Sequence, residues 1–372
     1  MTCVKETDFE RAKSEIREIL ATARIPYADV ICYKGEEEIL RLVYGEKTTG
    51  TENLQMFSCS KPVTSFAAMQ LVERGLLGLD DDVEKYLPEI GGRYLIDERG
   101  NKVEPKNKMT VRNLLTMTAG FTYNTRTAPI LELQKKNPDA NLRDFIPTFV
   151  ATPMAFEAGT KFEYSLCYDV LAAVIEAATK TKFSTFVKEN IFEPLGMKKS
   201  FFDNREARFP QKYFVNEKGE MRPCGEENEL ILTKNYESGG AGLVSTVENY
   251  SEFAKCLWRG GVTALGERIL GEKYLKQLSS EQVGSASVKN QFTCVQGADY
   301  GYGFGVRVRK VDTPWGLKKG EFGWDGAAGS YSFIDPNENV VIVMGMNLLG
   351  WPNVFTGKHV EIVRAIYENL IL

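Results

Sequence analysis

The two ends of this 372-residue chain carry β-strand patterns, and the long middle is helical. Near the start, Val30 to Tyr33 and Ile39 to Tyr44 are β-rich runs separated by a short polar segment, which predicts a hairpin. Near the end, residues 304–308 and 331–333 alternate apolar with other side chains, and Val340 to Met344 reads as a buried strand. The simplest assembly joins both ends of the chain in one antiparallel sheet.

Helical periodicity supplies the layers around that sheet. Apolar residues recur at helical spacing from Phe9 to Ala23 and from Ile362 to Leu370, so an amphipathic helix is expected near each end. Between about Pro62 and Gly260, helical patterns dominate, as in Tyr168 to Thr179 and Glu248 to Trp258. These helices need a sheet or other helices to cover their apolar stripes.

The length of the chain favours two packed units, since about 150 residues per domain is the usual expectation. We predict an α+β fold, an antiparallel sheet flanked by helices. Residues 1–61 and 261–372 form the discontinuous sheet domain, and residues 62–260 form an inserted, mostly helical subdomain. Functional clefts often lie where two such units meet.

Composition excludes several classes of protein. Hydrophobic residues make up 43% and charged residues 26% of the chain, as in soluble globular proteins. The net charge is −4 without a basic block, so we expect no nucleic-acid partner. The first twenty residues are charged, and no apolar run approaches the roughly 18 residues of a membrane span. We expect no membrane partner and a cytoplasmic location.

The numbers of cysteine and histidine residues limit the chemistry that this chain can perform. Seven cysteines without paired CxxC spacing favour reduced thiols over a disulfide framework or a zinc site. Phosphate-loop, GxSxG and HExxH signatures are missing, and Gly301 to Gly305 lacks dinucleotide-loop spacing, so we expect no cofactor and no metal. His359 is the single histidine, and it shares a face with apolar residues, so it is expected to be a packed or edge side chain. Any catalysis must rely on other side chains.

One short segment combines a nucleophile with a base. Ser58 has a lysine, Lys61, three residues later, and Pro62 is tolerated only in the first turn of a helix. The apolar helix from Val63 to Val72 must therefore begin near Ser58. Free backbone N–H groups at a helix N-terminus favour anions, and residues three apart share a face. The pattern indicates a serine nucleophile, a lysine base and part of an oxyanion hole.

Two plainer interpretations compete with this one. Ser58 is a serine at a helix start, where such residues commonly act only as caps, and Lys61 is then solvated. Cys59 is a rival nucleophile, although it lacks a histidine partner and is better explained as a packed thiol. A lysine with its ordinary pKa near 10.4 is protonated at neutral pH, so catalysis requires Lys61 to be desolvated or placed beside a cation.

Longer segments carry a family resemblance along almost the whole chain. The chain resembles the serine β-lactamase and penicillin-binding-protein superfamily, in particular the class C-like branch that includes family VIII carboxylesterases. The segments that carry the resemblance are Met56–Pro62, Gly78–Val83, Leu114–Gly120, Phe156–Ser165, Pro194–Met197 and Trp324–Tyr331. The resemblance implies a β-lactamase-like fold and places the catalytic serine and lysine at Ser58 and Lys61.

The resemblance also implies a third catalytic residue. Phe156–Ser165 is similar to the segment that bears the Y-x-N element of the superfamily, so Tyr164 is expected to be the catalytic tyrosine. Leu166 then occupies the position of the asparagine and is expected at the substrate. An isolated tyrosine is otherwise an ordinary packing residue.

Trp324-Asp325-Gly326 resembles the third element of the superfamily, where many lactamases carry K-T-G. The resemblance places these three residues at the substrate and makes the backbone N–H of Ala327 the second oxyanion donor beside that of Ser58. Lys318-Lys319-Gly320 is the alternative match, and Trp324 as a packing aromatic at the sheet edge is the plain one. No catalytic role can be assigned to Asp325 from the sequence, since a carboxylate near the oxyanion would repel the developing charge unless its side chain points away.

These residues predict a serine hydrolase that acts on a small-molecule ester or amide through an acyl-enzyme. Leu166 and Trp324 supply neither the amide nor the cation with which lactamases hold their substrates, so an esterase is favoured. The alternatives are a β-lactamase or D-amino-acid peptidase, and a non-catalytic ligand-binding or sensor module on the same fold. The sequence makes no prediction of oligomeric state.

Overall fold

A seven-stranded antiparallel sheet forms one half of the computed structural model, which describes residues 6–46, 48–202, 209–216, 218–225, 227–283, 299–350 and 357–372. The strand order across the sheet is β2-β1-β13-β12-β11-β10-β9. Its strands are β1 (Ala28–Lys34), β2 (Glu37–Tyr44), β9 (Tyr300–Tyr302), β10 (Arg307–Arg309), β11 (Phe322–Asp325), β12 (Tyr331–Asp335) and β13 (Val340–Met346).

The central pairing joins the two ends of the chain, as predicted. β1 runs antiparallel to β13 from Ala28 opposite Met346 to Lys34 opposite Val340. Side chains alternate across a strand, so Val30 contributes to the core on one face of the sheet and Ile31 to the core on the other. Bringing together two segments so far apart in the sequence costs conformational entropy. Burial of apolar side chains on both faces of β1 and β13 offsets that cost.

The glycine-rich run near residue 303 differs from its predicted strand. The expected alternation from 304 to 308 becomes a tight turn between β9 and β10, in which the N–H of Gly303 bonds the carbonyl of Val306. Gly305 has a φ of +74°, and a Cβ there would lie 2.7 Å from the hydroxyl oxygen of Tyr168. The backbone approaches its neighbour too closely for a side chain, and β10 therefore begins only at Arg307.

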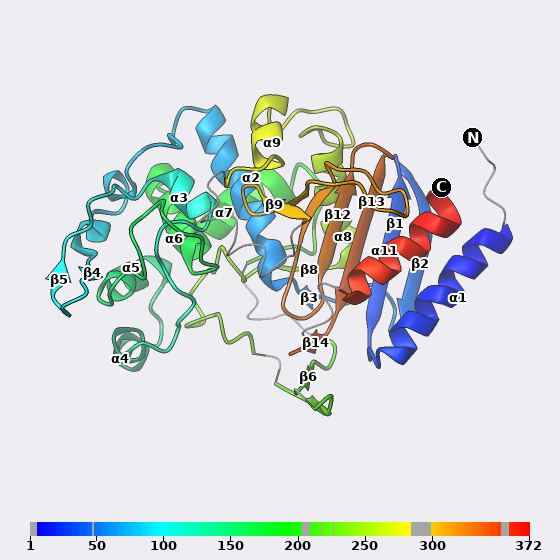
Figure 1. The fold of residues 1–372 in the computed structure, drawn as a ribbon, viewed down its shortest axis with the longest axis horizontal. Coiled ribbons are helices and arrows are strands. Elements are labelled where there is room, and N and C mark those ends of the chain that lie inside the picture. Colours follow the sequence, from blue (N-terminus) through cyan, green and yellow to red (C-terminus); the bar gives the residue numbers. More distant parts are fainter. Residues whose placement is uncertain are drawn as a thin grey trace.

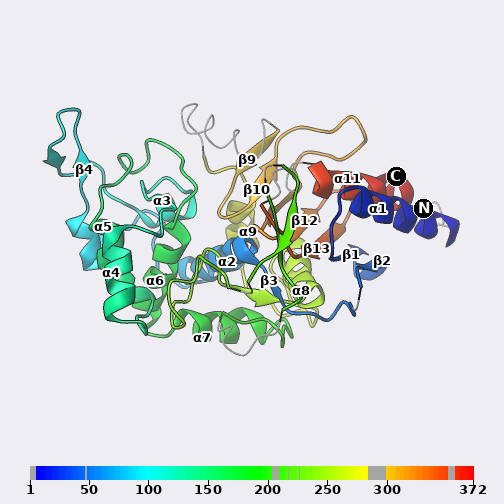
Figure 2. The ribbon, with the colours of Figure 1, turned by 90° about the horizontal axis from the view of Figure 1, so that it is seen from below.

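Helices cover both faces of the sheet. α1 (Glu6–Thr22) and α11 (His359–Ile366) pack together on one face, and α8 (Val247–Trp258) packs against β1, β12 and β13 on the other. Figures 1 and 2 show α1 and α11 side by side near the two termini, with the sheet between them and α8. The predicted α+β class, with an antiparallel sheet flanked by helices, is confirmed.

The second half of the molecule is helical and is organised around α2 (Ser60–Glu73). α2 is buried on every side from Ser60 to Leu71 and contacts α6, α7 and α9. Figure 1 shows α2 between the sheet and the outer helices. The other α-helices of the described residues are α3 (Val111–Leu115), α4 (Ala128–Lys136), α5 (Leu142–Val150), α6 (Cys167–Thr179), α7 (Phe183–Val187) and α9 (Glu272–Leu278). π-Helical turns continue α7 through Phe192 and α11 through Ile371.

Three small sheets within the described residues are absent from the sequence predictions. β3 (Leu54–Gln55) pairs with β8 (Val244–Ser245), β4 (Leu95–Ile96) pairs with β5 (Lys102–Val103), and β6 (Tyr213–Val215) lies between β7 (Met221–Pro223) and β14 (Leu348–Leu349). Two or three residues are too few to show a period. The predicted division at residues 61/62 and 260/261 stays a prediction, and α8 lies within the inserted segment although it packs on the sheet.

None of the helices described combines the length and the apolar character that crossing a bilayer requires. The five described cysteines carry free thiols, whereas Cys3 and Cys294 lie outside the described residues. The predicted cytoplasmic location stays a prediction.

Candidate active site

Ser58 lies in the turn that joins strand β3 to helix α2. The turn is a 3₁₀ helix, Phe57–Cys59, and Pro62 falls in the first turn of α2, as predicted. Phe57 has a φ of +45°, a left-handed conformation that is strained for a non-glycine residue. Cys59 is the N-cap of α2 and makes no side-chain capping bond. The partly exposed Ser58 hydroxyl is therefore not engaged as the cap of this helix.

Lys61 lies fully buried one turn further along, with its amine directed at Ser58. Its Nζ is 3.0 Å from Ser58 Oγ and donates to the carbonyl oxygen of Gly240 at 2.7 Å. The Tyr164 ring centroid lies 4.5 Å from Nζ. Desolvation lowers the pKa of Lys61 to about 7, although the carboxylate of Asp169 opposes the shift. The amine is therefore available as a base at neutral pH.

Tyr164 lies beside the same two residues, on the segment that precedes α6. Its hydroxyl makes a hydrogen bond with Ser58 and accepts one from the indole N–H of Trp324 at 3.2 Å. The rings of Tyr123 and Trp324 pack on either side at centroid distances of 5.7 and 5.9 Å. Desolvation raises the pKa of Tyr164, and these two hydrogen bonds oppose the shift. The phenol is neutral at physiological pH and has a proton to donate.

The turn between β11 and β12 brings Ala327 toward the Ser58 segment. A Cβ on Gly326 would lie 2.3 Å from the carbonyl oxygen of Met56, and Ser330 Oγ donates to that same oxygen at 2.7 Å. The N–H of Gly329 bonds the carbonyl of Gly326, which leaves Ala327 exposed at the tip. Among the described residues, the N–H groups of Ser58 and Ala327 have no backbone acceptor. Both are available to hold an oxyanion.

Trp324 and Asp325 point to opposite faces of β11. Trp324 is 1% exposed and packs against the rings of Tyr302 and Tyr164. Its side chain therefore contacts these two tyrosines and is not exposed to solvent. β11 lies between β12 and β10, so Trp324 does not cap a sheet edge. Asp325 pairs in register with Tyr331, and the guanidinium of Arg307 lies 4.3 Å from the centroid of that ring. Alternation of side chains along the strand places the carboxylate on the face opposite Trp324.

Two other predicted positions lie apart from this cluster. Leu166 is 4% exposed and lines a separate small hollow with Phe121 and Ile130. Lys318 lies in an exposed loop, where its amine pairs with Asp312 at 3.3 Å. Of the two alternative matches to the third element, only the one at Trp324 lies beside Tyr164. The catalytic and substrate-binding roles of all these residues stay predictions.

Three residues of the cluster escaped the sequence analysis. The hydroxyl oxygen of Tyr123 lies 3.5 Å from Lys61 Nζ, and the carbonyl oxygen of Gly240 accepts a hydrogen bond from that amine. Asp169 is a buried acid whose negative charge raises the pKa of Lys61. An acid inside an otherwise apolar helix and the glycine-rich run around Gly240 were the available signals. Neither signal indicates that the residue contacts Lys61.

Cys59 and His359 are packed, as expected. Burial raises the pKa of the Cys59 thiol to about 12, so it is a poor nucleophile at neutral pH. His359 is fully buried, its Nε2 lies 3.1 Å from the carbonyl oxygen of Gly329, and burial lowers its pKa to about 3. Among the described residues, no cluster of three or more acidic, cysteine or histidine side chains suits a metal ion.

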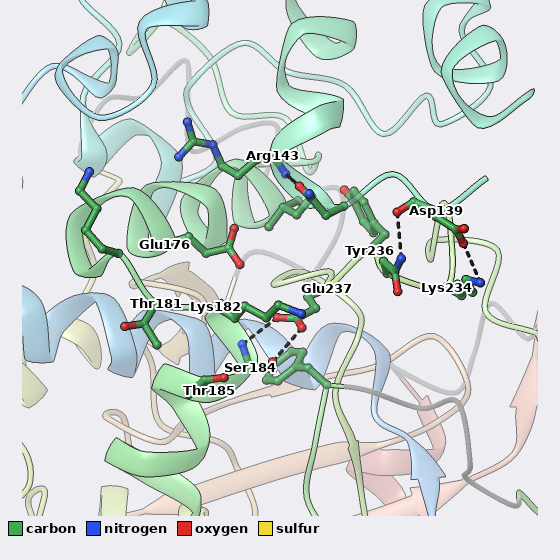
Figure 3. A pocket seen from close by; sticks show the side chains of 15 residues that line it. Asp139, Arg143, Glu176, Thr181, Lys182, Ser184, Thr185, Lys234, Tyr236 and Glu237 are labelled. Atoms are coloured by element: carbon green, nitrogen blue, oxygen red, sulfur yellow. Dashed lines mark hydrogen bonds and ion pairs between the residues drawn. The ribbon is translucent and has the colours of Figure 1, made fainter. Parts of the chain in front are cut away.

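A polar cavity of about 650 Å³ lies among α5, α6 and α7, and neither Ser58 nor Lys61 lines it. Figure 3 shows Glu237 at this cavity, where its carboxylate accepts bonds from the N–H and hydroxyl of Ser184, both at 2.8 Å. Lys234 pairs with Asp139 at its rim. These charges already have partners within the protein.

Comparisons with known proteins agree with this fold. The hydrolase EstCE1, with promiscuous acyltransferase activity, has a similar structure, with a TM-score of 0.81, 24% identity and coverage of 98% of this chain and 100% of its own. The lovastatin esterase of Penicillium rubens is 26% identical over 77% of this chain and 77% of its own length. Esterase EstB of Burkholderia gladioli is 24% identical over 88% and 85%.

The family model named Beta-lactamase matches residues 12–365, which is nearly the whole chain. The match spans the Ser58 turn, the Tyr164 segment and the turn at Gly326. The predicted superfamily is confirmed: this chain belongs to the β-lactamase family.

Proposed function

We propose that this protein is a serine hydrolase that cleaves small-molecule carboxylic esters through an acyl-enzyme on Ser58. The Ser58 oxygen forms a bond to the substrate carbonyl carbon while its proton passes to the Lys61 amine. Tyr164 relays that proton to the leaving alkoxide as the ester C–O bond breaks. The N–H groups of Ser58 and Ala327 hold the oxyanion. In deacylation, water passes a proton through Tyr164 to Lys61 and bonds to the acyl carbon, the bond from that carbon to the Ser58 oxygen breaks, and the serine recovers the proton as the acid leaves.

One observation carries the proposal: a fully buried amine, with a pKa lowered to about 7, lies 3.0 Å from the hydroxyl of Ser58. A solvated lysine would be protonated and could not accept the proton. Each proton transfer of this kind contributes roughly 10²- to 10⁴-fold to a rate, and each oxyanion donor roughly 10²- to 10³-fold.

The wall of the site favours a neutral ester over a charged amide. The partly exposed rings of Tyr123 and Tyr164 lie beside Lys61 and Ser58, and the buried ring of Trp324 packs against Tyr164. The lysine of the alternative match is paired in an exposed loop. Such a surface suits an acyl group without a carboxylate. The lovastatin esterase and esterase EstB among the relatives support the same substrate class.

The test is labelling with a fluorophosphonate and turnover of short p-nitrophenyl esters. We expect Ser58→Ala to abolish both, because the attacking oxygen is lost. Cys59→Ala is the matched control and should keep both, since the buried neighbouring thiol is not the nucleophile. Undiminished labelling in Ser58→Ala would overturn the proposal.

The rival activities are separated in the same assay. Faster turnover of a chromogenic cephalosporin than of the esters would identify a lactamase, and cleavage of a D-amino-acid amide a peptidase. A sensor module predicts thermal stabilisation by the ligand without turnover. Multiple turnovers on any ester exclude that module.

A further inference from the structure

Asp169 is a buried carboxylate that the proposed reaction leaves without a role. It lies in the first turn of α6, which packs against α2, and is 1% exposed. Neither of its carboxylate oxygens accepts a hydrogen bond of ordinary geometry within the described part of the chain. Burial of such a group is costly, and its neighbours offset only part of its desolvation.

Gly240 brings this carboxylate and the lysine amine to one place. Lys61 Nζ donates to the carbonyl oxygen of Gly240 at 2.7 Å. A Cβ on Gly240 would lie 2.9 Å from Asp169 Oδ2 and 3.6 Å from Lys61 Nζ. The carboxylate and the amine therefore face the same small space, in a water-poor interior where charges act strongly on each other.

Other charged or titratable groups also face Lys61, but they stabilise its ammonium form less than Asp169 does. The acids that raise the pKa of its amine are Asp169, Cys59, Asp325 and Cys167, with Asp169 the largest. The rings near the amine are those of Tyr123, Tyr164 and Tyr168. The two thiols have raised pKa values, and Asp325 lies on the opposite side of its strand with Arg307. Asp169 is left as the effective counter-charge.

The surroundings of Asp169 point back to the lysine. Ser238, Lys61 and Tyr236 lower its pKa, although burial raises it overall. Its negative charge in turn raises the pKa values of Tyr123, Cys167 and Tyr236. Lys61 is the cation among these neighbours.

We propose that Asp169 is a positioning residue for the lysine base, and that its charge stabilises the ammonium that forms when Lys61 takes the proton of Ser58. This role rests on the proposed function. The proton moves from Ser58 to Lys61 and on through Tyr164, and Asp169 exchanges none. Its charge keeps the amine basic enough to react despite burial, and the Gly240 carbonyl fixes the direction of the amine.

The test is the pH profile of kcat/KM of the full-length protein on p-nitrophenyl butyrate, for wild type and Asp169→Asn. Loss of the negative charge destabilises the ammonium, so the pKa of Lys61 falls further. We expect the acid limb to move about one pH unit lower and the plateau to fall about tenfold, because a weaker base transfers the proton less well. A purely structural role lowers the plateau and leaves the limb in place.

Glu176→Gln is the matched control. Glu176 lies two turns further along α6 and has a raised pKa, but its carboxylate accepts from the N–H of Phe183 at 2.9 Å, at the cavity of Figure 3. Its profile should keep the wild-type limb. An unmoved limb in folded Asp169→Asn overturns the proposal, and so does an equal shift in Glu176→Gln.

Tyr236→Phe covers the case in which Asp169→Asn does not fold. This phenol faces Asp169 and lowers the pKa of that carboxyl by interacting with its charged form. Its loss makes the carboxylate harder to ionise, so the limb should move in the same direction by a smaller amount, and no movement overturns the proposal. Ser58→Ala in the same series separates the two proposals: retained turnover there overturns the proposed function and this role together.

Discussion

The central residue-scale feature is an amine whose charged form is destabilised by burial. Lys61 is fully buried beside three aromatic rings, and desolvation lowers its pKa to about 7. Ser58, by contrast, is partly exposed. A reagent in solution can reach the hydroxyl, whereas water cannot easily solvate the ammonium.

This arrangement predicts an acid limb near pH 7 in kcat/KM for an uncharged ester. Lys61 must be neutral to accept a proton, so activity should rise with pH through about 7 and fall about tenfold per unit below it. The measurement is initial rate from pH 5 to 9, with Ser58→Ala as the blank for spontaneous hydrolysis. Constant activity between pH 5.5 and 8 would contradict the role of the lysine.

A second residue-scale prediction concerns the indole of Trp324. Trp324→Phe keeps an aromatic ring against Tyr164 but removes the donor at 3.2 Å. We expect kcat to fall about tenfold, which corresponds to roughly 1.4 kcal/mol for a lost hydrogen bond, with KM little changed. Trp315→Phe is the control, because that ring packs on Tyr367 beside α11. A rise in KM with kcat intact would instead make Trp324 a substrate contact.

At the scale of elements, the β11–β12 turn and the start of α2 function as one unit. Gly326 lies against the carbonyl of Met56, and Nε2 of His359 in α11 lies 3.1 Å from the carbonyl oxygen of Gly329 in the same turn. Ala327 is thereby held between the sheet and the nucleophile segment. The glycine is required here by close approach of backbone, which a Cβ would prevent.

Gly326→Ala should therefore lower kcat strongly. Its Cβ would lie 2.1 Å from Ser330 Oγ and 2.3 Å from Met56 O, so the turn must shift and the Ala327 N–H with it. We expect a loss of about 10²-fold or more in kcat on p-nitrophenyl butyrate, the scale of one oxyanion donor. Gly92→Ala, with open space around its Cβ, should leave kcat unchanged. A kcat within twofold of wild type in Gly326→Ala would remove Ala327 from the mechanism.

At the scale of the whole molecule, one continuous core joins the sheet to the helices. Phe253 of α8 is fully buried and packs edge-on against Phe66 of α2 at a centroid distance of 5.7 Å. α8 also covers β12 and β13. The sheet and the helical half thus share side chains, and neither buries its apolar face alone.

Phe253→Ala should lower the free energy of unfolding by about 3–5 kcal/mol, because it opens a cavity at this junction. Urea unfolding followed by far-UV circular dichroism and by tryptophan fluorescence should give one coincident transition. Leu265→Ala is the control: its side chain is 94% exposed, and a change within about 0.5 kcal/mol is expected. Two separate transitions would show that the halves unfold independently.

Local patterns in the sequence determined a substantial part of this protein. The S-x-x-K spacing and Pro62 predict the turn at Ser58 because a helix places residues three apart on one face, whatever surrounds it. Alternation and helical periodicity likewise predict β1, β2, β12, β13 and the end helices, and family resemblance pointed to Tyr164.

Only the tertiary structure decided which distant groups meet. Tyr123, Asp169 and Gly240 surround the lysine from three separate segments, and no periodicity along the chain encodes a contact across it. The faces of Trp324 and Asp325 follow from the register of β11, which pairing with β12 sets. The basicity of Lys61 depends on exclusion of water by all these elements together, because desolvation belongs to the packed interior and not to any residue within it.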